Sequence, residues 1–176
     1  MKNGRTPVVV SIVLSVIALS LVSAAEPGAA PAFDDRTAFE ALKALAGNWE
    51  GKTSEHGEQP VAETFRVIAG GSVVLEDMFP GTPHEMMTVY HMDGDRLVLT
   101  HYCAIGNQPR MRFEKTGRPG EIRFAFAGGT NLRADRDEHM HEVTIRLAGG
   151  RLESEWVSWK DGARGHAASF ALARKP

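Results

Sequence analysis

The sequence has a single cysteine, no excess of basic residues and one long apolar run. Because Cys103 is the only cysteine among 176 residues, an internal disulfide is excluded and packing must hold the fold together. The 20 basic and 22 acidic residues give a formal net charge of −2. This balance disfavours nucleic-acid binding, which usually shows as a basic face or stripe. No Gly-x-Ser-x-Gly, Walker or zinc-protease motif occurs, so enzyme activity has no sequence signature.

The long apolar run lies at the N-terminus and predicts export. Lys2 and Arg5 precede an apolar core at residues 8–22, and small residues follow at 22–25, as in a secretory signal peptide. The run is shorter than the about 20 residues of a membrane-spanning helix, and neither a twin-arginine pair nor a lipid-anchor cysteine accompanies it. We therefore predict a signal peptide at 1–25, a flexible leader at 26–33 and one domain at 34–176. The mature protein is expected in the periplasm or secreted, without a membrane anchor and with a formal charge of −4.

The remaining chain predicts one short helix followed by strands. Asp34–Leu45 has acidic residues in its first turn and apolar residues at helical spacing. Short alternating runs follow, separated by turn signals of which Asp93-Gly94 and Gly149-Gly150 are the clearest. This regular punctuation favours a mainly β fold, a single antiparallel up-and-down β-barrel with a short N-terminal helix. We expect about ten strands, near 48–54, 61–69, 72–79, 84–92, 95–103, 109–115, 120–127, 139–148, 151–159 and 164–173.

Several motifs resemble those of known barrel families. The segment Gly47-Asn48-Trp49-Glu50-Gly51 resembles the Gly-x-Trp-x-Gly entry of calycin barrels, which comprise lipocalins, fatty-acid-binding proteins and nitrobindins. From Leu45 to Arg174 the chain resembles bacterial exported lipocalin-like domains of unknown function. Four motifs carry this resemblance: Gly-Gly-Ser-Val-Val-Leu-Glu at 70–76, Glu-Met-Met-Thr-Val-Tyr-His at 85–91, Leu-Thr-His-Tyr-Cys at 99–103 and Asn-Gln-Pro-Arg-Met at 107–111. The resemblance implies that Trp49 closes one barrel end. Nitrobindins hold haem through a histidine on the last strand, to which His166 would correspond, but Lys52-Thr53 departs from their pattern.

Three histidines occupy strand positions where apolar residues are expected. Residues two apart on a strand share a face, which places His101 and Cys103 with Leu97 and Leu99. The same alternation places His139 and His141 with Val143, Ile145 and Leu147. An inward imidazole is either a hydrogen-bonded core group or the polar floor of a ligand cavity.

Our leading prediction is a barrel that binds a small apolar or amphiphilic molecule. The apolar lining is expected from Leu97, Leu99, Phe124, Val143, Ile145 and Phe170. Arg110 follows the strand of His101 and offers a planar fork of donors for a polar head, although it could equally lie in solvent. The predicted ligand-binding residues are Tyr90, His101, Cys103, Asn107, Gln108, Arg110, Met111 and His141.

Three alternatives stay open at this stage. The first is a metal or haem site built from His101, His139 and His141, to which Cys103 or His166 could add a ligand. The second is a small hydrolase or isomerase with histidine acid–base chemistry, which needs an inward carboxylate partner; the candidates are Glu76, Glu85 and Glu155. The third is a structural envelope protein whose barrel is filled.

Overall fold

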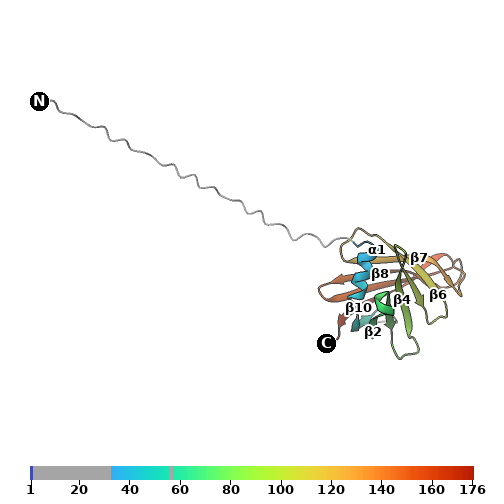
Figure 1. Ribbon diagram of the computed structural model, residues 1–176. Coiled ribbons are helices and arrows are strands. Elements are labelled where there is room, and N and C mark those ends of the chain that lie inside the picture. Colours follow the sequence, from blue (N-terminus) through green and yellow to red (C-terminus); the bar gives the residue numbers. More distant parts are fainter. Residues whose placement is uncertain (2–32, 56–57) are drawn as a thin grey trace.

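Ten antiparallel strands close into a barrel in which every strand pairs with its neighbours in sequence (Figure 1). The computed structural model describes residues 1, 33–55 and 58–176. The predicted signal peptide and nearly all of the leader lie outside these residues. The predicted fold class is confirmed, and the closed barrel is consistent with a calycin-like fold.

Each predicted element is present within a few residues of its expected bounds. The helix α1 spans Asp35–Lys43, and a short 3-10 turn η1 spans Ala69–Gly71. The strands are β1 Gly47–Thr53, β2 Gln59–Ile68, β3 Val73–Met78, β4 Met86–Asp93, β5 Arg96–Tyr102, β6 Gln108–Glu114, β7 Glu121–Thr130, β8 His139–Ala148, β9 Arg151–Lys160 and β10 Ala163–Arg174. No helix in the described part of the chain has the length and apolarity needed to cross a membrane.

The helix α1 covers one end of the barrel. Asp34 caps its first turn by accepting a hydrogen bond from the Thr37 backbone N–H at 2.7 Å, and the Thr37 hydroxyl accepts from the Asp34 N–H. One face of the helix buries Ala38, Phe39 and Leu42. The Asp35 carboxylate accepts a hydrogen bond of 2.8 Å from the Leu97 N–H, which ties the helix to β5.

Trp49 closes the same end, as the family resemblance implies. Its side chain is buried, and its indole Nε1 donates to the Leu45 carbonyl at 2.8 Å. The Arg174 guanidinium lies 4.6 Å from the centre of the Trp49 ring system and donates to the Ala44 and Ala46 carbonyls. Arg174 thereby binds carbonyl groups at the end of the helix and joins the last strand to the first.

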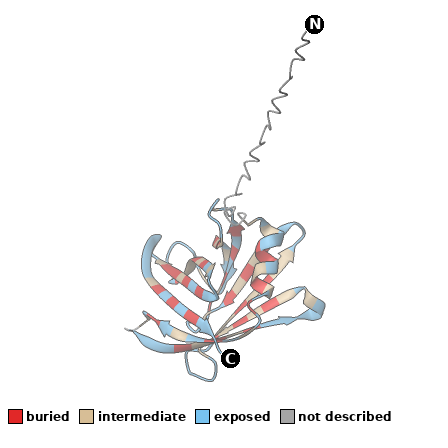
Figure 2. Ribbon diagram, turned by 90° about the vertical axis from the view of Figure 1, so that its left-hand side faces the viewer, coloured by how far each residue is buried: buried red, intermediate tan, exposed pale blue. Residues whose placement is uncertain are grey.

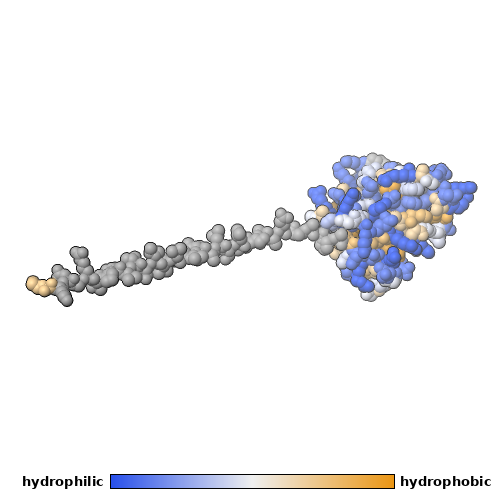
Figure 3. Space-filling view, turned by 90° about the horizontal axis from the view of Figure 1, so that it is seen from above, coloured by the Kyte–Doolittle hydropathy of each residue, from blue (hydrophilic) through white to orange (hydrophobic). Residues whose placement is uncertain are grey.

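Side chains fill the half of the barrel next to this closed end. Buried and exposed residues alternate along the strands, which places one apolar face inside (Figure 2). From above, the surface is mostly hydrophilic with a smaller apolar region (Figure 3). Five residues predicted to line a cavity instead pack in this core, each at most 1 % exposed: Leu97, Leu99, Phe124, Val143 and Ile145.

Candidate functional site

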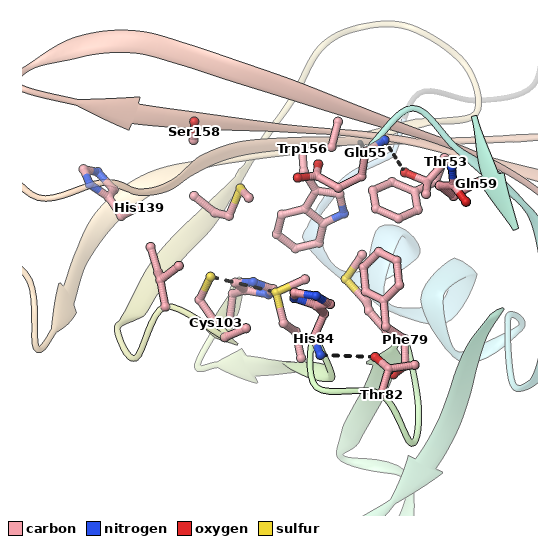
Figure 4. Close-up of a pocket in the computed structure, with 18 of the residues that line it drawn as sticks. Thr53, Glu55, Gln59, Phe79, Thr82, His84, Cys103, His139, Trp156 and Ser158 are labelled. Atoms are coloured by element: carbon pink, nitrogen blue, oxygen red, sulfur yellow. Dashed lines mark hydrogen bonds between the residues drawn. The ribbon is translucent and has the colours of Figure 1, made fainter. Parts of the chain in front are cut away.

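A cavity of about 530 Å³ opens at the barrel end opposite to α1 (Figure 4). Its volume lies in the range typical of small-molecule sites. The apolar part of the lining includes rings and flexible side chains from five strand positions and from the loop after β3: Met78, Met86, Met140, Trp156, Phe170 and, in the loop, Phe79. The polar lining includes Thr53, Glu55, Gln59, Thr82, His84, His101, Cys103, Glu138, His139 and Ser158.

His101 lies at the inner boundary of this cavity and is 1 % exposed. Its Nδ1 is 3.0 Å from the Thr88 hydroxyl, and its ring lies 4.8 Å from the Trp156 ring. Its Nε2 has no hydrogen-bond partner within the described structure. Burial lowers the pKa of His101 to about 4, so the imidazole is neutral at physiological pH. His101 therefore adds polarity to the cavity without adding charge.

Two carboxyl groups lie behind His101. Glu76 accepts a hydrogen bond of 2.6 Å from the Tyr90 hydroxyl and another from Thr88, which also contacts His101. Glu63, on the neighbouring strand β2, interacts with Glu76. Burial raises the pKa of Glu76 to about 7, and burial together with the Glu76 charge raises that of Glu63 well above its usual value. The polar layer Glu63, Glu76, Thr88, Tyr90 and His101 thus crosses four adjacent strands, β2 to β5.

Cys103 lines the cavity wall opposite to Trp156 (Figure 4). Its Sγ lies 3.9 Å from the Met86 Sδ, and burial raises the pKa of the thiol. A raised pKa lowers the thiolate fraction, so this cysteine should react more slowly with thiol reagents than an exposed cysteine does.

Of the two histidines of β8, His139 faces inward as the alternation predicts, whereas His141 does not. A bulge between Met140 and Glu142 shifts the pairing of β8 with β9. His139 is fully buried and lines the cavity; its Nδ1 donates to the Asp137 carbonyl at 2.7 Å, and its Nε2 lies 3.0 Å from His141 Nδ1. His141 is half-buried, stacks on Trp159 at 4.1 Å, and does not line the cavity. Desolvation and the neighbouring His139 lower the pKa of His141.

The structure brings two of the eight predicted ligand-binding residues, His101 and Cys103, to the cavity. Tyr90 and Met111 are buried in the core, and Arg110 is exposed. Asn107 donates to the Glu138 carbonyl at 2.7 Å and so fixes the loop beside the entrance. Gln108 bonds Gly106, Thr130 and Asn131 on the rim.

The three histidines predicted as metal ligands do not come together. Within the described residues, no group of three or more His, Cys, Asp or Glu side chains has the arrangement of a metal site. His166, the haem candidate, is exposed and lies 3.4 Å from the Glu55 carboxylate instead of lining the cavity. Of the three carboxyl groups predicted as possible acid partners of a histidine, only Glu76 is linked to one, since Thr88 joins it to His101. Glu85 is exposed, and Glu155 faces Arg164.

Sequence reasoning missed Glu63, Trp156 as a cavity wall, and Phe79. Glu63 shares a strand face with Val61 and Phe65, both buried, so the same alternation that singled out His101 also signals this carboxyl group. Trp156 is 2 % exposed and faces inward, whereas Trp159 is half-buried. Phe79 lies in the loop after β3 at φ 56°, a conformation with no clear sequence signal.

A closed antiparallel barrel can hold a ligand in its interior, and this one has a cavity at its open end. No protein-family model and no curated protein matches the chain.

Proposed function

We propose that this protein is an exported binding protein of the calycin type that holds a small apolar or amphiphilic molecule at the open end of its barrel. The observation that carries the proposal is the cavity of about 530 Å³, walled by Trp156, Phe170 and three methionines. Apolar burial of about 25 cal/mol per Å² would drive binding, and flexible methionines suit ligands of varied shape. Export is inferred from the N-terminal sequence.

The single cysteine provides the test, because a thiol-specific reagent can modify only the cavity wall. Cys103 carrying a bulky maleimide should lose binding of the neutral dye N-phenylnaphthylamine, followed by dye fluorescence. Bound dye should in turn slow the labelling. The matched control is Cys103→Ser treated with the same reagent, which should bind the dye as the untreated wild type does. Undiminished dye binding by the fully labelled protein, or no binding by the unlabelled protein, would refute the proposal.

A second candidate is acid–base catalysis at His101, favoured by its connection through Thr88 to the Glu76 carboxyl group. General bases work best with a pKa near the working pH, whereas burial lowers that of His101 to about 4. We therefore rank catalysis below binding. An NMR titration decides between them: a His101 midpoint near neutrality would favour catalysis, and the absence of titration above about pH 5 favours binding.

A further inference from the structure

The barrel interior contains two acidic side chains and no basic partner for them. Glu63 and Glu76 are each 1 % exposed. The buried polar residues of the described chain include no Lys or Arg, and none of its ion pairs involves either carboxyl group. Ionised carboxylates are costly to bury unless a cation or several hydrogen-bond donors compensate for lost hydration. The interior therefore lacks a positively charged or donor-rich group.

Several polar atoms buried in the barrel interior also have no hydrogen-bond partner in the described part of the chain. Both Glu63 oxygens, His101 Nε2, Ser154 Oγ and Trp156 Nε1 are buried without a hydrogen-bond partner within the described residues. Among them the indole is the one obligatory donor, while a carboxylate only accepts. Buried polar atoms are normally paired, so these atoms show that the hydrogen-bond network of the interior is incomplete.

These groups lie directly behind the cavity. Met78 lines the cavity and is the cross-strand partner of Glu63 in the pairing of β2 with β3. His101 also lines it and contacts Thr88, which bonds Glu76. Glu63 is therefore next to a residue of the cavity wall, and Glu76 is linked to the wall through Thr88 and His101; the thioether of Met78 is flexible enough to move aside.

We propose that the cavity selects amphiphiles with a protonated amine head, which Glu63 and Glu76 bind while the apolar part lies against Trp156 and Phe170. This inference rests on the proposed binding function and adds the chemical class of the ligand. An alkylammonium head supplies three donors and the missing charge. An alcohol supplies one donor and no charge, and a carboxylate would face two buried acids without a compensating cation. The aromatic wall also favours a cation, since ring faces attract positive charge.

The test is displacement of bound N-phenylnaphthylamine by three ligands of equal chain length: decylamine, decanol and decanoate. A charged hydrogen bond in a buried site is worth about 1.5–3 kcal/mol, so decylamine should displace the dye about tenfold or more better than decanol. Decanoate should be the weakest. Glu63→Gln and Glu76→Gln keep the side-chain shape and should reduce the preference for the amine to about threefold or less, with decanol binding unchanged. Glu153→Gln, which removes an exposed carboxylate of β9 that does not line the cavity, is the matched control and should keep the preference.

A second measurement on the wild type avoids dependence on the variants. Amine binding requires the acid pair to lose its proton, so decylamine affinity should rise between about pH 5.5 and pH 8 while decanol affinity stays flat. The titratable groups facing the pair are Tyr90 from β4 and His101 from β5; the first stays protonated and the second neutral in this range. Equal displacement by the three ligands, or a flat pH profile for decylamine, would overturn the amine proposal and leave the binding function standing. Failure of the dye to bind at all would refute the binding function itself.

Discussion

Glu76 is transferred on folding from water to an apolar interior, and its ionisation should be visible in the stability of the protein. Burial raises its pKa from the ordinary 4.5 to about 7, so the folded state binds a proton more tightly than the unfolded state does. The resulting stabilisation is present below pH 4.5 and is lost as pH rises through about 7. His101 acts in the opposite direction, because its lowered pKa costs stability as pH falls from about 6.5 towards 4.

Glu76→Gln should isolate the contribution of Glu76 to the pH dependence of the free energy of unfolding. The amide keeps an acceptor for the Tyr90 hydroxyl but does not ionise. Between about pH 4.5 and pH 8 the variant should therefore gain on the order of 2–3 kcal/mol of stability relative to the wild type. Urea unfolding of both proteins over this range measures the difference, from which the His101 contribution cancels. A difference that does not change with pH would contradict the assigned burial effect.

At the scale of elements, the close approach of β1 and β10 completes the barrel. Gly51 pairs with Leu172, and a Cβ at this position would lie 2.0 Å from the Ala171 carbonyl oxygen. No side chain fits there without moving the backbone. Gly51, the second glycine of the Gly-x-Trp-x-Gly segment, therefore has a steric role at the place where the first and last strands meet.

Gly51→Ala should separate these strands and destabilise the protein by about 3 kcal/mol or more. The control is Gly70→Ala: its Cβ would meet nothing within 4 Å, although its φ of 64° should cost about 1 kcal/mol. Thermal unfolding monitored by circular dichroism compares the two variants. Equal losses in both would show that steric contact at Gly51 is unimportant.

The elements themselves were largely predictable, because alternation and turn residues are local signals. The Ala148↔Arg151 pair leaves the expected two-residue loop Gly149-Gly150, and the Asp93↔Arg96 pair leaves the two-residue loop Gly94-Asp95, one residue later than the Asp93-Gly94 signal. The inward direction of His101 followed from the same alternation. His141 did not follow it, because the bulge after Met140 inserts an extra residue and redirects the side chain. A bulge depends on pairing with a neighbouring strand, which the sequence of β8 alone does not specify.

At the scale of the whole molecule, the barrel has a filled half and a hollow half. The predicted lining residues belong mostly to the filled half, while Phe170 and His101 reach the cavity. The alternation along a strand predicts which residues face inward. It does not predict at which level along the barrel axis the inward side chains leave a cavity. That depends on which side chains meet across the barrel, a property of strand register and tilt.

This division should appear in hydrogen exchange. Amides of β5 and β7 near Leu97 and Phe124 should exchange slowest, because they lie in the packed half. The loops at 79–85 and 103–107, which border the cavity, should exchange faster and become slower when N-phenylnaphthylamine is bound. Hydrogen–deuterium exchange followed by mass spectrometry measures both regions. Protection by the dye that is confined to the filled half would place the ligand elsewhere.

Both ends of the folded domain lie on the side away from the entrance. The helix that opens the domain is bonded to β5 at the closed end, and the Lys175 N–H donates to the Asn48 carbonyl beside it. A polypeptide fused before Phe33 or after Pro176 would therefore extend from the sealed side. The domain can accordingly be attached to a sensor chip or a resin through Pro176, with its mouth facing the bulk solution and free to exchange small molecules.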